Sequence, residues 1–192
     1  MTRQTTLLTS HKGVDLHAAS ALRVMQDRLE GGERLVNLLR CELHTFWGET
    51  VDGGLDRLLN TGRYFNPNKH HYGHFLSAQD TASWLGGDPV SGRTVNNWPG
   101  EFAGTDLDGL TDGEALYQRL LGGPVAGGHT AVDVIAFALG QSGPVLSGVL
   151  WRLVVSGDPA TALDIGRGLA VARGRKDGLL LNPHMEAWLI RS

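Results

Sequence analysis

Two matched Asn-Pro steps, at Asn66-Pro67 and Asn182-Pro183, constrain the fold more than any other feature of the sequence. In each, an aromatic residue follows six residues after the asparagine: Tyr72 in the first and Trp188 in the second. Proline excludes its predecessor from the helical region, so an Asn-Pro step suits the passage from a helix end into a strand. We therefore expect the two steps to occupy equivalent turns, each leading into a strand of one sheet.

Similar elements precede both turns. Residues 149–155 are rich in β-formers and predict a buried strand, and Asp158-Pro159 then opens a helix, with aspartate as N-cap and proline at the first helical position. Earlier in the chain, an apolar segment at 38–47 and a short helix at 55–59 take the same order. Helical and strand periodicity both fit residues 35–47, and the parallel with the later unit favours a strand. The pattern predicts two β-α-β units, at 37–76 and 147–192.

Two such units that share one antiparallel sheet, with helices on one face, predict an α+β protein of duplicated, ferredoxin-like βαβ architecture. The 192 residues fit a single domain. Its expected parts are an N-terminal segment 1–36 with a helix from Asp15 to Leu29, the first unit, a Gly-rich insertion at 77–146 and the second unit. Within the insertion we predict helices at 112–121 and 130–139.

The composition excludes several classes of protein. A net charge of -3 without a basic run argues against nucleic acid as the main partner. A single cysteine, Cys41, allows no internal disulfide. No stretch approaches the ~20 apolar residues of a membrane span, and residues 1–12 lack the apolar core of a signal peptide. We expect a cytoplasmic protein that binds neither membranes nor nucleic acid.

The segment Leu180-Leu181-Asn182-Pro183 resembles the closing motif of the PurS subunit of formylglycinamidine ribonucleotide synthetase, in which a Leu-Leu-x-Asn-Pro turn leads through a glutamate to an aromatic residue. Glu186 and Trp188 stand at the matching positions, and Asp158-Pro159 is similar to the Asp-Pro that opens a helix in that family. That family is a single, much shorter unit. The resemblance implies a small non-catalytic subunit that oligomerises through its sheet and bridges larger catalytic partners.

The densest ionisable cluster is His70-His71-x-x-His74. His70 and His74 would share a face on a helix or on a strand, and neutral imidazole suits a transition metal. Cys41 or His44 from a neighbouring strand could complete such a site. The alternative is a polar strand face or a pH-sensitive interface.

Other motifs carry weaker signals. Gly123 to Thr130 has the spacing of a phosphate loop, but His129 replaces the lysine. Asp106 to Glu114 is similar to a calcium loop with too few carboxylates. Cys41 lies in an apolar segment and is expected to be buried, with His44 on the opposite strand face.

We therefore expect a non-catalytic accessory or structural subunit that organises a larger enzyme complex, as a homo-oligomer or a hetero-complex. The candidate interface residues are Tyr72, Trp151 and Trp188, because aromatic residues dominate interface energetics. No catalytic residue and no cofactor is predicted. The alternative is a metal-dependent enzyme or a metal-handling protein, with His70, His71 and His74 at its centre.

Overall fold

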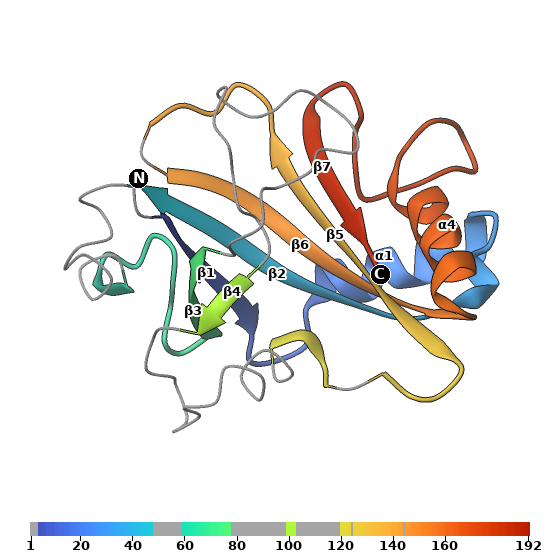
Figure 1. Ribbon diagram of the computed structural model, residues 1–192, viewed down its shortest axis with the longest axis horizontal. Coiled ribbons are helices and arrows are strands. Elements are labelled where there is room, and N and C mark those ends of the chain that lie inside the picture. The colour runs from blue at the N-terminus through green and yellow to red at the C-terminus, as the bar shows by residue number, and fades with distance from the viewer. Residues whose placement is uncertain (1–3, 48–58, 78–98, 103–119, 124, 144) are drawn as a thin grey trace.

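The computed structural model describes residues 4–47, 59–77, 99–102, 120–123, 125–143 and 145–192. They form an α+β fold around one seven-stranded sheet in the order β4-β3-β1-β2-β6-β5-β7, in which every neighbouring pair is antiparallel (Figure 1). The strands are β1 (Gln4–His11), β2 (Leu35–Trp47), β3 (His70–Ser77), β4 (Pro99–Phe102), β5 (His129–Ala138), β6 (Val145–Ser156) and β7 (Glu186–Arg191). The helices are α1 (Leu16–Arg28), the 3-10 turn η1 (Gly32–Arg34) and α4 (Pro159–Ala170).

The six strands that follow β4 in this order divide into two three-stranded halves. In the first half, β2 and β3 flank β1 and run antiparallel to it. In the second half, β6 and β7 flank β5 in the same way. The halves meet where β2 pairs with β6.

The Asn-Pro turns before β3 and β7 have the same hydrogen bonds. The Asn66 carbonyl accepts from the N–H groups of Lys69 and His70, and the Asn182 carbonyl accepts from the residues at the same spacing. Each asparagine side chain accepts from the N–H two residues on, at 2.9 Å for Asn66 and 3.0 Å for Asn182. Each asparagine N–H donates to the side chain four residues on, which is His70 in one turn and Glu186 in the other. The prediction of equivalent turns is confirmed.

The shared turns fix a residue correspondence between the halves. His70 pairs with His11 across β3 and β1, and Glu186 pairs with Ala138 across β7 and β5. The ladders then match pair by pair, since both are antiparallel. Corresponding positions include Leu7 and Val134, Phe46 and Leu153, Tyr72 and Trp188, Thr6 and Asp133, Thr45 and Arg152, Arg40 and Ser147, and His44 and Trp151.

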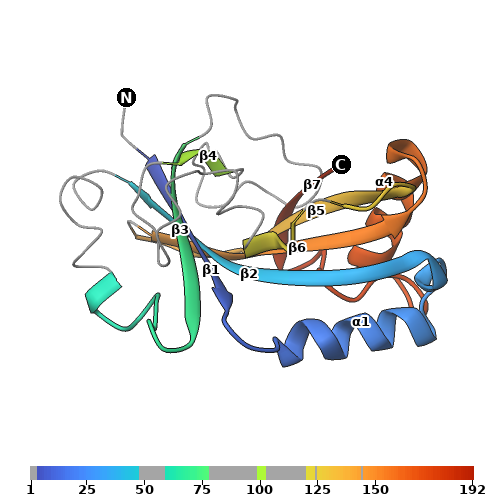
Figure 2. The same ribbon diagram turned by 90° about the horizontal axis from the view of Figure 1, so that it is seen from below.

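Both helices cover one face of the sheet, called the helix face here. Figure 2 shows α1 lying along this face beneath β2. The Asp15 side chain caps α1 by accepting from the N–H groups of His17 and Ala18, and Asp158 caps α4, which has proline in its first turn. Met25 of α1 and Leu169 of α4 are both buried in the same core cluster as Trp188. The predicted caps and the predicted helix 15–29 are thus confirmed within a residue or two.

The opposite face carries a second core. Its buried members include Cys41, Leu43, Ile135 and Leu150, with Leu120 and Leu121 packed on them. β6 therefore buries apolar side chains on both faces, as its sequence predicts. Both faces of the sheet thus carry buried apolar side chains.

Other predictions need correction. The expected helix at 130–139 is β5, because Val132 and Val134 face one core while Ile135 and Phe137 face the other. A strand buried on both faces has an unbroken apolar sequence that periodicity cannot separate from a helix. β1 was not predicted, and β5 lies inside the predicted insertion 77–146. A ferredoxin-like arrangement is not evident in this strand order. No helix among the described residues is long and apolar enough to cross a membrane.

Candidate functional site: the fork between β1 and β2

The two central strands of the first half separate partway along their length. β1 pairs with β2 from Gln4–Trp47 to Thr9–Glu42 and then turns away into α1, whereas β2 continues back to Leu35 against β6. Residues 35–41 of β2 thus have a strand neighbour on one side only within the described residues. We call this gap, between residues 10–13 and residues 37–40, the fork.

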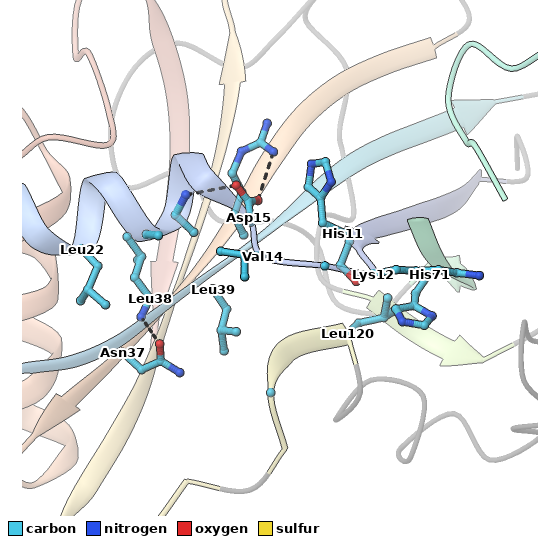
Figure 3. A pocket seen from close by; sticks show the side chains of 16 residues that line it. His11, Lys12, Val14, Asp15, Leu22, Asn37, Leu38, Leu39, His71 and Leu120 are labelled. Carbon is cyan, nitrogen blue, oxygen red and sulfur yellow. Dashed lines mark hydrogen bonds and ion pairs between the residues drawn. The ribbon is translucent and has the colours of Figure 1, made fainter. Parts of the chain in front are cut away.

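The fork contains a cavity of about 410 Å³ (Figure 3). Ala18, Ala19 and Leu22 of α1 line it from the helix face, and Leu120 and Gly122 line it from the opposite face. Small side chains on α1 leave this space open. A Cβ on Gly122 would meet the Leu39 side chain at 2.6 Å, and the positive φ of +87° also favours glycine there. Val14 in the lining is about three-quarters exposed, at 78%.

Backbone groups of β2 point into the fork. The Leu38 N–H donates to the Asn37 Oδ1 at 2.9 Å, so it faces away from β6. Backbone groups of an antiparallel strand alternate in direction, so the N–H and C=O of Arg40 face the same way as those of Leu38. No described residue on the β1 side pairs with the backbone of Arg40. The fork therefore presents peptide donors and acceptors beside an apolar space.

The second half fills the matching position. Its hairpin is closed by residues 139–144, and Gln141 from that turn bonds both backbone groups of Ser147, the residue that corresponds to Arg40. The Ser147 N–H donates to Gln141 Oε1 at 2.9 Å, and Gln141 Nε2 donates to the Ser147 carbonyl at 2.8 Å. The first half has α1 inserted at this place instead. The open backbone of Arg40 is thus a difference between two otherwise matched ladders.

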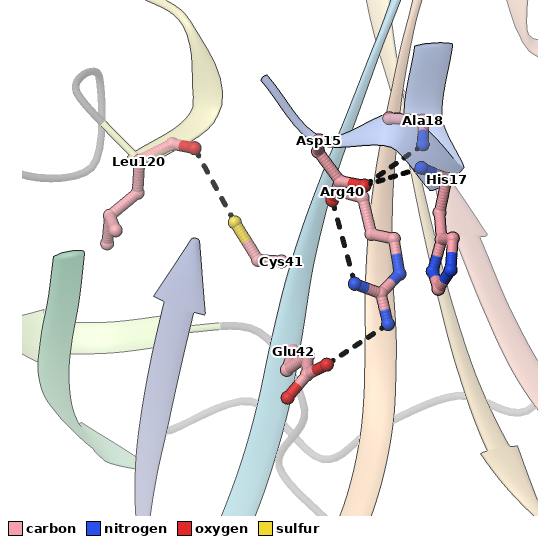
Figure 4. Close-up of polar contacts among 7 residues, drawn as sticks. All are labelled: Asp15, His17, Ala18, Arg40, Cys41, Glu42 and Leu120. Carbon is pink, nitrogen blue, oxygen red and sulfur yellow. Dashed lines mark hydrogen bonds and ion pairs between the residues drawn. The ribbon is translucent and has the colours of Figure 1, made fainter. Parts of the chain in front are cut away.

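Of the two basic side chains at the fork, Arg40 is paired with carboxylates and Lys12 is not paired by any described residue. The Arg40 guanidinium lies 3.6 Å from Asp15 and 3.2 Å from Glu42 (Figure 4). It also lies over the Trp151 ring, at 5.8 Å from the ring centroid. Lys12 lines the cavity, is exposed, and has no acidic partner among the described residues. The fork therefore carries one positive charge that its own described residues do not neutralise.

The predicted histidine cluster lies on a strand and is divided between the two faces of the sheet. His70 and His74 share the helix face with Tyr72 between them, and His71 faces the other way and lines the fork. The ring neighbour of His70 is His11, at 5.1 Å between centroids. Burial and then the nearby His11 lower the pKa of His70. His74 Nε2 bonds the Thr5 hydroxyl, which donates onward to the Phe75 carbonyl.

β1 separates β3 from β2, so His44 and Cys41 do not join His70 and His74 as proposed from the sequence. Leu7 of β1 lies directly between His74 and His44. Among the residues that the structure describes, no three His, Cys, Asp or Glu side chains gather as a metal site.

His44 is buried on the helix face. Its Nδ1 lies 2.9 Å from the Ser147 hydroxyl, and its ring contacts the Tyr64 ring at 4.8 Å. Burial lowers the pKa of His44 to about 4. A serine beside a histidine is the beginning of a nucleophilic pair, but a base with so low a pKa is poorly matched to neutral pH.

Cys41 lies on the opposite face from His44, as predicted. It is fully buried, its thiol contacts the Leu120 carbonyl at 3.5 Å, and burial raises its pKa to about 12. Such a thiol is a packing residue and not a nucleophile.

The candidate interface residues are mostly buried within their own chain. Trp188 and Tyr72 are 7% and 8% exposed, in the helix-face cores of the second and first halves. Trp151 is half-buried beside Arg40. These side chains therefore leave little surface for a partner.

The Gly-rich segment 123–130 leads into β5 and not into a helix. The helix N-terminus that its possible phosphate role needed is therefore absent from that position. The calcium-like segment 106–114 lies outside the described residues, as does most of the predicted helices 55–59 and 112–121.

The sequence analysis missed the fork. Nothing in the local pattern distinguishes a strand with two neighbours from one that loses a neighbour halfway. The lengths of the two connections carried a signal. Residues 12–34 connect β1 to β2, whereas the much shorter segment 139–144 connects β5 to β6.

Comparison with known proteins adds no assignment: no family model, no curated protein and no solved structure matches the chain.

Proposed function

We propose that the protein is a non-catalytic accessory subunit that holds a partner protein in the fork. The single observation that carries this proposal is the open backbone at Arg40, whose counterpart at Ser147 is filled by Gln141. An extended segment of a partner can add to such an edge through main-chain hydrogen bonds, with specificity from pockets for its alternate side chains. The accessory role is also what the PurS resemblance implies.

The proposal includes an origin for the two halves. We infer that the two halves are copies of one ancestral unit, as the duplication predicted from the sequence implies. The matched Asn-Pro turns and the same antiparallel arrangement of three strands in each half support this inference. In one copy the hairpin stayed closed, and in the other the insertion that carries α1 opened it. A binding site then lies where the copies differ.

The dimensions of the fork suit a short peptide strand. Residues 37–41 of β2 extend about 3.3 Å each, so they match about five residues of a partner. The small residues Ala18 and Ala19 leave space on one side of such a strand, and Leu39 with Gly122 provides an apolar wall on the other. The exposed Val14 in the lining would lose its contact with water on binding.

The test is to fill the fork. Ala19→Trp places an indole in the cavity, and Ser20→Trp adds the same side chain at the next exposed position of α1, outside the lining. Tagged protein from cells that make it should recover a defined partner with the unmodified chain and with Ser20→Trp. Ala19→Trp should reduce that recovery at least tenfold. Circular dichroism and thermal melting check that both variants fold.

Recovery of the same partner by all three proteins would overturn the proposal, and so would the absence of any stoichiometric partner. Heptapeptides selected on the unmodified protein from a displayed random library provide a second measurement. Their affinity, measured by fluorescence anisotropy, should fall with Ala19→Trp and stay unchanged with Ser20→Trp.

A further inference from the structure

We infer that the segment received by the fork carries a carboxylate at the end that lies beside Lys12. This inference rests on the proposed function, and it names the chemistry of the partner. It follows from the charges around the cavity and from the direction of β1.

Lys12 is the residue that supplies the uncompensated charge. It directly follows β1, and its backbone N–H continues the β1–β3 ladder by donating to the Lys69 carbonyl at 2.8 Å. This bond holds the Lys12 backbone at the end of the fork. Its exposed side chain lines the cavity and has no acidic partner in the described part of the chain.

The other charged residues in the lining compensate one another. Asp15 receives the N–H groups of the first turn of α1 and lies 3.6 Å from Arg40. Arg40 is also held by Glu42, and its side chain is only 13% exposed. A partner carboxylate would therefore find its free cation at Lys12 and would not need to break the Arg40 pairs.

The direction of the partner strand determines which of its carboxylates lies beside Lys12. A segment that continues the line of β1 in the same direction brings its first residue to Lys12. A segment that runs the other way brings its last residue there, along with its C-terminal carboxylate if the chain ends. Both cases place a carboxylate beside the same ammonium group, and both fit the main-chain edge of β2.

Three pentapeptides separate these cases, each labelled on a central side chain. Acetyl-Asp-Val-Thr-Val-Thr-amide has its acid first, acetyl-Thr-Val-Thr-Val-Asn has a free C-terminal carboxylate, and acetyl-Asn-Val-Thr-Val-Thr-amide has neither. Their dissociation constants for the full chain are measured by fluorescence anisotropy at about pH 8, where ordinary imidazoles are neutral. One of the two acidic peptides should bind about three- to fivefold tighter than the neutral peptide, as for an ion pair near the surface.

Lys12→Gln and Lys69→Gln are the matched variants. Lys69 is exposed and adjacent to Lys12 but does not line the cavity. Lys12→Gln should bring the acidic and neutral peptides to equal affinity, while Lys69→Gln should keep the preference. In the unmodified protein, the preference should shrink when salt is raised to about 1 M, because salt screens an exposed pair.

Equal binding of all three peptides to the unmodified protein would overturn the carboxylate inference and leave the fork as a peptide site. A preference that survives Lys12→Gln would also overturn it. If none of the peptides binds, both the carboxylate inference and the proposed function fail.

Discussion

The two halves of the sheet have the same strand arrangement and differ in the side chains at corresponding positions. On the helix face, the second half has Ala138, Trp151, Glu186 and Ile190 where the first half has His11, His44, His70 and His74. The second half also bonds its hairpin edge with Gln141, whereas no residue in the described part of the chain bonds the corresponding backbone at Arg40. The difference teaches that one backbone arrangement can have a position filled by a side chain in one half and left unfilled by the described residues in the other. The unfilled position is where we propose that a partner binds.

The largest expected difference between the halves is on the face opposite the helices. Asp133 and Arg152 form a two-bond ion pair at 2.7 and 2.9 Å, and the corresponding Thr6 and Thr45 form a single hydroxyl contact at 3.3 Å. Arg152→Met leaves a buried carboxylate without its partner and should lower the free energy of unfolding by about 3–5 kcal/mol. Thr45→Val should cost about 1 kcal/mol.

Denaturant titration measures both of these substitutions. Adding Asp133→Leu to Arg152→Met should recover much of the loss, because it removes the stranded charge. Equal costs for Arg152→Met and Thr45→Val would show that the ion pair does not distinguish the halves.

Where corresponding residues of the two halves are both buried, the same substitution should lower the free energy of unfolding by a similar amount. Trp188 and Tyr72 occupy corresponding buried positions on the helix face. Each substitution to alanine should lower the free energy of unfolding by roughly 3–5 kcal/mol, which is usual for a large core aromatic. A loss below about 1 kcal/mol for either residue, measured by urea titration, would break the correspondence of the two cores.

The buried His44 of the first half, which corresponds to Trp151 in the second, should make stability depend on pH. Burial disfavours the charged form of His44 and lowers its pKa to about 4 in the folded protein, below the usual value of about 6.5 for histidine. As pH falls, the unfolded chain binds this proton first. Stability should therefore fall between about pH 6.5 and 4, by up to about 3 kcal/mol from this residue.

His44→Phe tests this pH dependence, because it puts an aromatic ring without a titrating group where the second half has Trp151. The urea midpoint of the variant should depend less on pH over that window than the midpoint of the unmodified protein. Identical slopes for the two proteins would show that His44 titrates normally.

The smallest effect concerns the close approach of α4 to β5 in the second half. A Cβ on Gly166 would lie 2.7 Å from Val132 Cγ1, and a Cβ on Gly168 would meet nothing within 4 Å. Gly166→Ala should therefore destabilise by about 1–3 kcal/mol. Gly168→Ala, in the same helix, should stabilise by about 0.5–1 kcal/mol, because alanine is the better helix former. Thermal melting compares the two variants, and stabilisation by both would mean that α4 lies farther from the sheet.

Local chemistry was enough to predict the turns and caps. Asn182 and Asp158 each act through their own side chain on the next few N–H groups, so the short segment alone specifies the structure. The helix at 15–29 and the strand at 149–155 were also predicted from their own short segments. β5 was mistaken for a helix because its Val132-to-Phe137 run is buried on both faces and has no alternation to detect.

The fork depends on long-range geometry and could not be derived from short segments. It exists because β1 leaves β2 after Thr9, and because Leu120, far along the chain, packs on the opposite side. The same holds for His70, whose contact with His11 depends on β1 lying between β3 and β2. Sequence spacing placed His70 with His74, but strand order decided which side chains meet.

Amide hydrogen exchange at Arg40 and Ser147 tests the central claim most directly. The two N–H groups correspond when the β1–β2 and β5–β6 ladders are extended. Among the described residues, that of Ser147 has a side-chain acceptor, Gln141, at 2.9 Å, and that of Arg40 has none. In the free protein, Arg40 should exchange at least about tenfold faster than Ser147, because its edge is open. A peptide bound in the fork should slow Arg40 and leave Ser147 unchanged. Equal protection of the two amides in the free protein, or a bound peptide that leaves Arg40 fast, would contradict strand addition at the fork.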